Sequence, residues 1–473
     1  MDAPCIACPV RDSSTTILRS TTIVSNIEIC KQGAVSEPGA AVRACAAGSN
    51  AGASGRDTGK TSTSMNIERT EDQYIDLLLA SVDLQAGHNL LIRAEPIHWD
   101  LCNRIAVAAY QRGANYVHVI SMHEKLKRAR IDHAPEESLD FVPEFVPAQY
   151  REFADGSWAV LVLVGPEDPD LMADADPVRS GRIGKAQAQA MQEFRDRLQR
   201  DRFGWCIGAV PTPKWAAKVT GLPAGDEAVA RLWEIMTPIL RLDHENPAAE
   251  WKSHARTLKA RARKLTEMGL SSLHLRSGDT DLRVGLLPES TWIGGGGQKP
   301  DGRPFLPNVP TEEVFTTPHR ERTNGHAVVT RPVQVLGKIV EGAWFTFENG
   351  VVTDYGADRG AEILTQYFEI DKNANRLGEI ALVDSTSPVF TSETVFYNIL
   401  FDENAACHMA LGSSYPGCVA GSENLDNEAY VAHGGNRSNL HTDFMIGTPD
   451  ISVSGETASG ETVEIMRDGR FAL

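Results

Sequence analysis

The 473-residue sequence lacks a long apolar run, an excess of basic residues and a regular array of cysteines. Its longest apolar stretch, residues 158–164, is far shorter than the ~20 residues of a membrane-spanning helix, so we expect no membrane span. Lys and Arg total 46 against 63 Asp and Glu, which gives a formal net charge of −17. This acidic balance argues against a nucleic-acid partner, because phosphates are bound by clustered Lys and Arg.

The cysteines show no pattern of a disulfide framework. Four of the eight lie in the first 45 residues and the others are scattered. We therefore expect a reducing compartment and a cytoplasmic location. The first residues contain no charged segment followed by an apolar one, so we expect no secretory signal.

Residues 1–64 differ in composition from the rest of the chain. They are rich in Ser, Thr, Ala and Gly and contain no aromatic residue. Such a segment cannot bury enough apolar area to offset the entropy lost on ordering, and we predict a disordered extension. Cys5-x-x-Cys8 lies within it, but no second pair follows at the spacing of a zinc ribbon, so we do not assign a metal site there.

Residues 65–269 alternate between helical and strand patterns. We predict strands at 89–94, 116–121, 158–165 and 205–210, with helical patterns before, between and after them. Strands separated by helices indicate a parallel sheet with helices on its faces. Residues 246–269 form a long basic helix that ends at Gly269. This part is predicted to be an N-terminal α/β domain.

Residues 270–473 have a different pattern, in which short strand-like segments are separated by Gly, Pro and Asn. They predict a mainly antiparallel α+β domain, so the whole chain is of the α/β class with two domains. Gly294–Gly297 lacks the Gly-Lys-Ser/Thr of a phosphate-binding loop, and we expect a flexible loop there.

Acidic and imidazole side chains in this second domain recur beside apolar segments. An unpaired buried charge costs several kcal/mol, so such groups need partners. Carboxylates combined with imidazoles suit Zn, Mn, Co or Fe. On a strand, His441 and Asp443 share one face, whereas the adjacent Glu312 and Glu313 point to opposite faces and are expected to have different roles. The candidate residues are Glu312, Glu313, Glu379, Glu403, His408, His441 and Asp443.

Several long motifs then carry a resemblance to a known family. They are NVPTEEVFTTPHR, LGEIALV, FYNILFDENAACHMALGSSYP and HTDFMIGTPD, with AVPTPKWA and RLWEIM upstream. In order and spacing these resemble the aminopeptidase T family of thermophilic-type metallo-aminopeptidases. The resemblance covers residues 66–473, and residues 1–64 have no counterpart in most of the family.

The resemblance implies two divalent metal ions and a homodimer. Tyr415 matches a family active-site tyrosine. Glu313 is preferred to Glu312 as a ligand because its distance to Glu379 in the sequence resembles the family spacing. The implied metal ligands are Glu313, Glu379, Glu403, His408, His441 and Asp443.

A mechanism follows from that resemblance. Two metal ions, Zn, Co or Mn, would activate a water molecule for attack on the first peptide bond of a substrate with a free N-terminus. Glu312 is the candidate general base, and Tyr415 the candidate donor to the oxyanion.

Two other interpretations remain open at this point. A mononuclear Fe(II) ring-cleaving dioxygenase could use His408, His441 and Asp443, but this leaves the three glutamate ligands without a role. A non-catalytic metal-stabilised binding protein would leave Tyr415 without one. Metal content separates the interpretations, since the peptidase needs two ions per chain and the oxygenase one.

Overall fold

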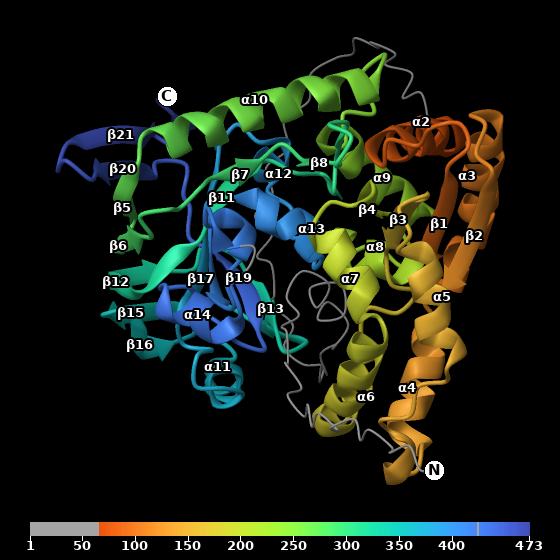
Figure 1. Ribbon diagram of the computed structural model, residues 1–473, viewed down its shortest axis with the longest axis horizontal. Helices are drawn as coiled ribbons and strands as arrows, with labels where there is room; N and C mark the ends of the chain where they lie inside the picture. Colours follow the sequence, from red (N-terminus) through yellow and green to blue (C-terminus); the bar gives the residue numbers. More distant parts are fainter. Residues whose placement is uncertain (1–65, 423–424) are drawn as a thin grey trace, which may run out of the picture.

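The structure, a computed structural model, describes residues 66–422 and 425–473 (Figure 1). The predicted extension at 1–64, with Cys5 and Cys8, lies outside these residues. The described chain combines one parallel sheet with antiparallel sheets that follow it in the sequence, which confirms the predicted α/β class. No helix among the described residues is both long and apolar enough to cross a bilayer.

The parallel sheet has the strand order β10-β4-β3-β1-β2. Four of its strands lie where the sequence predicts them. Residues 158–163 are buried without alternation, as expected for a central strand covered on both faces. The strands are β1 (Asn89–Ala94), β2 (Tyr116–Ser121), β3 (Trp158–Val164), β4 (Trp205–Ala209) and β10 (Asn308–Val309).

Helices cover both faces of this sheet. Leu90 and Ile92 contribute to the core on one face, whereas Leu91 points into the core on the other. The helical stretch between β3 and β4 is interrupted at Met191, which separates α6 from α7. The helices are α2 (Ile67–Ser81), α3 (Trp99–Gln111), α4 (Glu124–His133), α5 (Phe145–Phe153), α6 (Pro177–Ala190), α7 (Gln192–Gln199), α8 (Pro213–Thr220) and α9 (Asp226–Ile239).

Helix α10 (Pro247–Glu267) joins the two halves of the molecule (Figure 1). Asn246 caps its first turn, accepting a hydrogen bond from the backbone N–H of Ala249, and Pro247 occupies the first helical position. Trp251 lies in the core of the parallel sheet, whereas Leu258 lies in the core of the antiparallel part. The helix contacts α2 as well as strands β7 and β11.

The two halves also exchange segments. Strand β10 comes from the second half of the sequence but pairs in parallel with β4. Val389, Phe396 and Leu400 likewise belong to the core of the parallel sheet. The domain boundary predicted at 269/270 stays a prediction. Residues from both sides of it contribute to the core of the parallel sheet.

A five-stranded antiparallel sheet carries the candidate site. Its strand order is β19-β18-β17-β11-β7. Every residue of β17, β18 and β19 is buried, so the sheet is central to the molecule. The strands are β7 (Ile293–Gly294), β11 (Glu313–Thr316), β17 (Leu377–Val383), β18 (His408–Gly412) and β19 (His441–Met445).

An eight-stranded antiparallel sheet packs against it through one large apolar core. Its strands, in spatial order, are β16 (Val351–Gly356), β15 (Trp344–Glu348), β12 (Pro318–Val328), β6 (Thr280–Leu286), β5 (Leu270–Ser277), β20 (Ser452–Thr457), β21 (Thr462–Arg467) and β22 (Arg470–Phe471). The remaining elements are β8 (Gly297–Gln298), β9 (Pro304–Phe305), β13 (Val333–Val335), β14 (Lys338–Val340), α11 (Ala361–Glu369), α12 (Pro388–Thr391), α13 (Ile399–Asp402) and α14 (Asn427–Ala432).

Candidate metal centre

Strand register places the acidic and imidazole groups on one face of the five-stranded sheet. Glu379 on β17 lies opposite Ala410 of β18, which in turn lies opposite Asp443 of β19. His408 lies opposite Ala381 on β17. Residues two apart on a strand share a face, and cross-strand partners share it too. The small alanine side chains therefore leave space between the ligating groups.

Two groups of buried side chains could each hold a cation. Glu313, Glu379 and His408 each offer one ligand atom, and these atoms lie within 4.8 Å of one another. Glu379, His441 and Asp443 form the second group by the same measure. Because Glu379 of β17 belongs to both groups, the two groups adjoin each other.

Both histidines are oriented by backbone carbonyls. His408 Nδ1 lies 3.0 Å from the carbonyl oxygen of Ala406, and His441 Nδ1 lies 2.7 Å from that of Ser413. A carbonyl can only accept, so Nδ1 carries the proton in the neutral ring and Nε2 keeps its lone pair. This is the arrangement in which a histidine binds a metal.

The ionisable side chains of the two groups shift one another's pKa values. Burial raises the pKa of Glu379 to about 7, and the charge of Glu313 adds to the rise. Burial opposes protonation of His408, but the adjacent carboxylate of Glu313 raises its pKa to about 10. Burial also works against the charge on Asp443, yet His441 keeps the pKa of Asp443 below its usual value. Each negative carboxylate thus favours the protonated form of a neighbouring imidazole, and each protonated imidazole favours the ionised form of a neighbouring carboxylate.

The residues fit divalent cations. Glu313 Oε2 is buried with no donor aligned on it among the described residues, although His408 Nε2 lies only 3.1 Å away. His441 Nε2 is similarly 3.2 Å from Glu379 Oε2 and 3.3 Å from Asp443 Oδ1. Carboxylate and imidazole atoms that converge in this way match the donors that Zn, Mn and Co prefer.

The cluster opens into a cavity of about 820 Å³ between the two halves of the molecule. Glu95 and Gly165, which follow β1 and β3, form part of the opposite wall. Gly294–Gly297, predicted to be a flexible loop, also lines the cavity, and its two ends belong to the short strands β7 and β8. A Cβ atom added to Gly296 would lie 2.4 Å from the backbone oxygen of Phe305, so a larger residue would displace this wall. That role depends on packing and has no signature in the sequence.

Two further predicted residues lie in the same cavity. Tyr415 is one wall residue, and its hydroxyl is 3.1 Å from His441 Nε2. Glu403 is another, at the start of a short 3₁₀ helix after α13, but it joins neither ligand group. The structure thus brings five of the six predicted ligands into the two groups and places Glu403 beside them.

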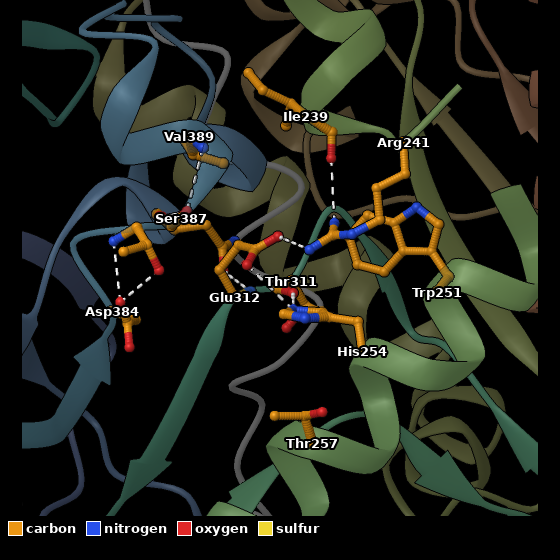
Figure 2. Close-up of polar contacts among 12 residues, drawn as sticks. Ile239, Arg241, Trp251, His254, Thr257, Thr311, Glu312, Asp384, Ser387 and Val389 are labelled. Carbon is orange, nitrogen blue, oxygen red and sulfur yellow. Dashed lines mark hydrogen bonds and ion pairs between the residues drawn. The ribbon is translucent and has the colours of Figure 1, made fainter. Parts of the chain in front are cut away.

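Glu312 lies among Arg241 and His254 just before β11 (Figure 2). Its Oε1 accepts a hydrogen bond from Arg241 Nη2 at 2.8 Å, and its Oε2 lies 3.1 Å from His254 Nε2. Among the described residues, Glu312 is not part of the cavity wall. The base role assigned to Glu312 from the sequence therefore does not fit its position. Adjacent residues at a strand point to opposite sides, and the side of Glu312 faces α10.

Replacing Glu312 tests whether its ion pair stabilises the folded protein. Burial alone would raise its pKa, but His254 and Arg241 lower the pKa below its usual value. The ion pair therefore stabilises the fold above the unfolded pKa of ~4.3, and this contribution is lost as the pH falls through the folded pKa. We expect Glu312→Gln to lower the unfolding free energy at pH 7 by roughly 3–5 kcal/mol. Urea unfolding measured at several pH values checks this.

Glu464→Gln is the matched control for that measurement. Glu464 is partly exposed and pairs with Arg467 at 2.6 Å, so its loss should leave the unfolding free energy nearly unchanged. Equal stability of the two variants at pH 7 would contradict the role given to Glu312.

Buried carboxylates and imidazoles that converge in two adjoining groups, at the wall of a large cavity, are typical of metal-dependent hydrolases. The chain matches the thermophilic metalloprotease family (M29) over residues 68–471. It is 37% identical over 407 residues to aminopeptidase 2 of Geobacillus stearothermophilus, with 86% of this chain and 98% of that protein covered. It is also 37% identical over 407 residues to aminopeptidase T of Thermus aquaticus, covering 84% and 98%.

A solved structure agrees with these matches. Wild-type AmpT from Thermus thermophilus superposes with a TM-score of 0.79 at 35% identity, covering 86% of this chain and all of that one. The chain therefore belongs to the thermophilic metalloprotease family, and the predicted resemblance is confirmed. It is a hydrolase of peptide bonds.

Proposed function

We propose that this protein is a dinuclear metallo-aminopeptidase that removes the first residue of short peptides. The observation that carries the proposal is the pair of ligand groups that share Glu379 at the wall of a cavity of about 820 Å³. A cavity of about 820 Å³ is of the size that takes a small ligand, and it suits a short peptide rather than a folded protein. The relatives named aminopeptidase support the same activity.

The metal ions would be held by Glu313, His408, His441 and Asp443, with Glu379 shared between them. Bound there, two divalent ions supply an activated water molecule and polarise the scissile carbonyl group. The dioxygenase alternative fits less well, because neither described ligand group contains both histidines. It would also leave Glu313 and Glu379 without a role.

The protein side chains would then handle protons and charge. Glu403 replaces Glu312 as the proposed general base, because it lines the cavity without belonging to a ligand group. Burial and the charges of Glu313 and Asp443 raise its pKa well above the usual value, which favours a carboxylate that both takes and returns a proton. Tyr415 would donate its hydroxyl hydrogen to the oxyanion that forms on the scissile carbonyl oxygen.

The free α-amine of the substrate would lie at this acidic end of the cavity. Acetylation removes its charge and adds bulk where the reacting groups must align, and a misplacement of ~1 Å can cost about 100-fold in rate. We expect an unblocked tripeptide to be cleaved at its first bond, and its N-acetyl analogue to be cleaved at least ~100-fold more slowly. Mass spectrometry of both digests measures this.

A chelator-treated sample is the control, and neither peptide should be cleaved in it. Internal cleavage of the acetylated peptide at a comparable rate would refute the aminopeptidase proposal while leaving the metal centre in place.

Three further properties are part of the proposal. The family resemblance supports a homodimer, and the donor set supports Zn, Co or Mn without selecting one. The cysteines of the described residues, Cys102, Cys206, Cys407 and Cys418, are free and buried, which supports a reducing cytoplasmic environment.

A further inference from the structure

Arg437 is a cation in the wall of the same cavity that the proposed chemistry does not use. It lies in the loop between α14 and β19 and is largely enclosed. Among the described residues, its guanidinium makes one hydrogen bond, from Nη1 to the carbonyl oxygen of Ser414 at 3.3 Å. Its Nε is buried with no acceptor in the described chain. A guanidinium has five N–H donors, so most of its capacity is available to a ligand.

No carboxylate of the described residues lies within 4.0 Å of the Arg437 guanidinium, the distance that defines an ion pair. Burial lowers the pKa of Arg437, as it does for any cation removed from water without a counter-charge. A largely buried cation without a counter-charge is stabilised when an anion binds to it.

The guanidinium is held in place before any ligand binds. It lies over the Tyr430 ring, 4.4 Å from the centroid, and the hydroxyl group of Tyr430 is 2.9 Å from Ser414 Oγ. Asn436 Nδ2 donates to the carbonyl oxygen of Gly412 at 2.6 Å, and Asn373 Nδ2 donates to that of Arg437 at 2.7 Å. Such a fixed group loses little entropy on binding.

Two adjacent backbone carbonyl groups connect Arg437 to His441, one of the proposed metal ligands. The carbonyl oxygen of Ser413 orients His441, and the next carbonyl oxygen, that of Ser414, accepts from Arg437. A di- or tripeptide spans about 7–11 Å when extended. A short peptide whose first bond lies at the ligand cluster can therefore place its far end in the same part of the cavity.

We propose that Arg437 binds a carboxylate of the peptide substrate, and that the group bound is the C-terminal carboxylate of a di- or tripeptide. The planar fork of an arginine matches a carboxylate with two parallel hydrogen bonds. An acidic side chain of the substrate offers the same chemistry, and the experiment below separates the two sources. This inference rests on the proposed aminopeptidase activity, and it makes the enzyme selective for short peptides with a free C-terminus.

The experiment compares three tripeptides on the metal-loaded full chain. They are leucylglycylglycine, its C-terminal amide, and the C-terminal amide of leucylglutamylglycine. The variants are Arg437→Met, which removes the charge, and Arg437→Lys, which keeps it without the fork. Arg376→Met is the matched control: Arg376 is also partly buried, donates to the carbonyl oxygen of Arg320 and does not line the cavity.

The parent enzyme should cleave the free acid roughly 10- to 100-fold better than its amide, because a hydrogen-bonded charge pair contributes this much to binding. Arg437→Met should abolish that ratio, mainly by raising KM for the acid, and Arg437→Lys should retain part of it. Arg376→Met should keep the parental ratio. If the glutamyl amide is cleaved as well as the free acid and loses this advantage in Arg437→Met, the side-chain carboxylate is a second accepted source.

An equal loss on the acid and the amide in Arg437→Met would show a structural role and overturn the inference. A parent enzyme that cleaves both at the same rate would also overturn it. Failure of the parent enzyme to cleave any of the three peptides would overturn the aminopeptidase proposal as well, so the two failures are distinguishable.

Discussion

Glu379→Gln is expected to lose bound metal and at least ~1,000-fold in kcat/KM, because a metal ion stabilises the transition state by several kcal/mol. Glu379 is the residue common to both ligand groups, so one substitution removes a negative charge from both. The neutral amide keeps the size of the side chain but no longer offsets the charge of a cation. Metal content per chain, measured by mass spectrometry of the purified protein, should fall from about two towards zero with the activity.

Folding of this variant can be assessed separately. Burial raises the pKa of Glu379 to about 7 in the metal-free fold, so its ionisation there is unfavourable. The amide removes that cost, and metal-free Glu379→Gln should melt no lower than the metal-free parent. Glu464→Gln, at an exposed position of β21, is the control and should keep metal and activity. A Glu379→Gln protein with full metal content and parental turnover would refute the site.

The sequence predicts the elements of the site better than their arrangement. The positions of β1, β2, β3 and β4 follow from local patterns of apolar residues, and so does a strand that carries His441 and Asp443 on one face. The register that aligns Glu379, Ala410 and Asp443 is a long-range property, set by packing across three strands. No local pattern contains that information.

The Glu312–Glu313 pair illustrates the same limit. The alternation of a strand predicts that the two carboxylates have different surroundings, and they do. Which one faces the candidate metal ligands depends on Arg241 and His254, which lie 71 and 58 positions before Glu312 in the sequence and reach it through the fold. Strand β10 is likewise invisible locally, because its two residues form a strand only beside β4.

Tyr415 contacts His441 of the candidate ligand cluster and also lines the cavity. It packs its ring 4.8 Å from the His441 ring and 5.7 Å from the Phe315 ring, which fixes the direction of its hydroxyl group. Burial, with the charges of Glu379 and Asp443, raises its pKa well above the usual value. The hydroxyl group therefore remains a protonated donor throughout the pH range in which the enzyme would work.

Tyr415→Phe is expected to lower kcat by about 100- to 1,000-fold, the loss measured when one donor to an oxyanion is removed. KM and metal content should change little, because the phenyl ring keeps the packing and the hydroxyl group acts on the charge that develops in the transition state. Tyr367→Phe is the matched control: its hydroxyl group donates to the carbonyl oxygen of Leu411 at 2.7 Å and does not reach the cavity. That change should cost some stability and leave kcat unaltered. A Tyr415→Phe enzyme with parental kcat would remove the oxyanion role. A parallel loss of metal would instead make Tyr415 a residue that positions His441, since their atoms lie 3.1 Å apart.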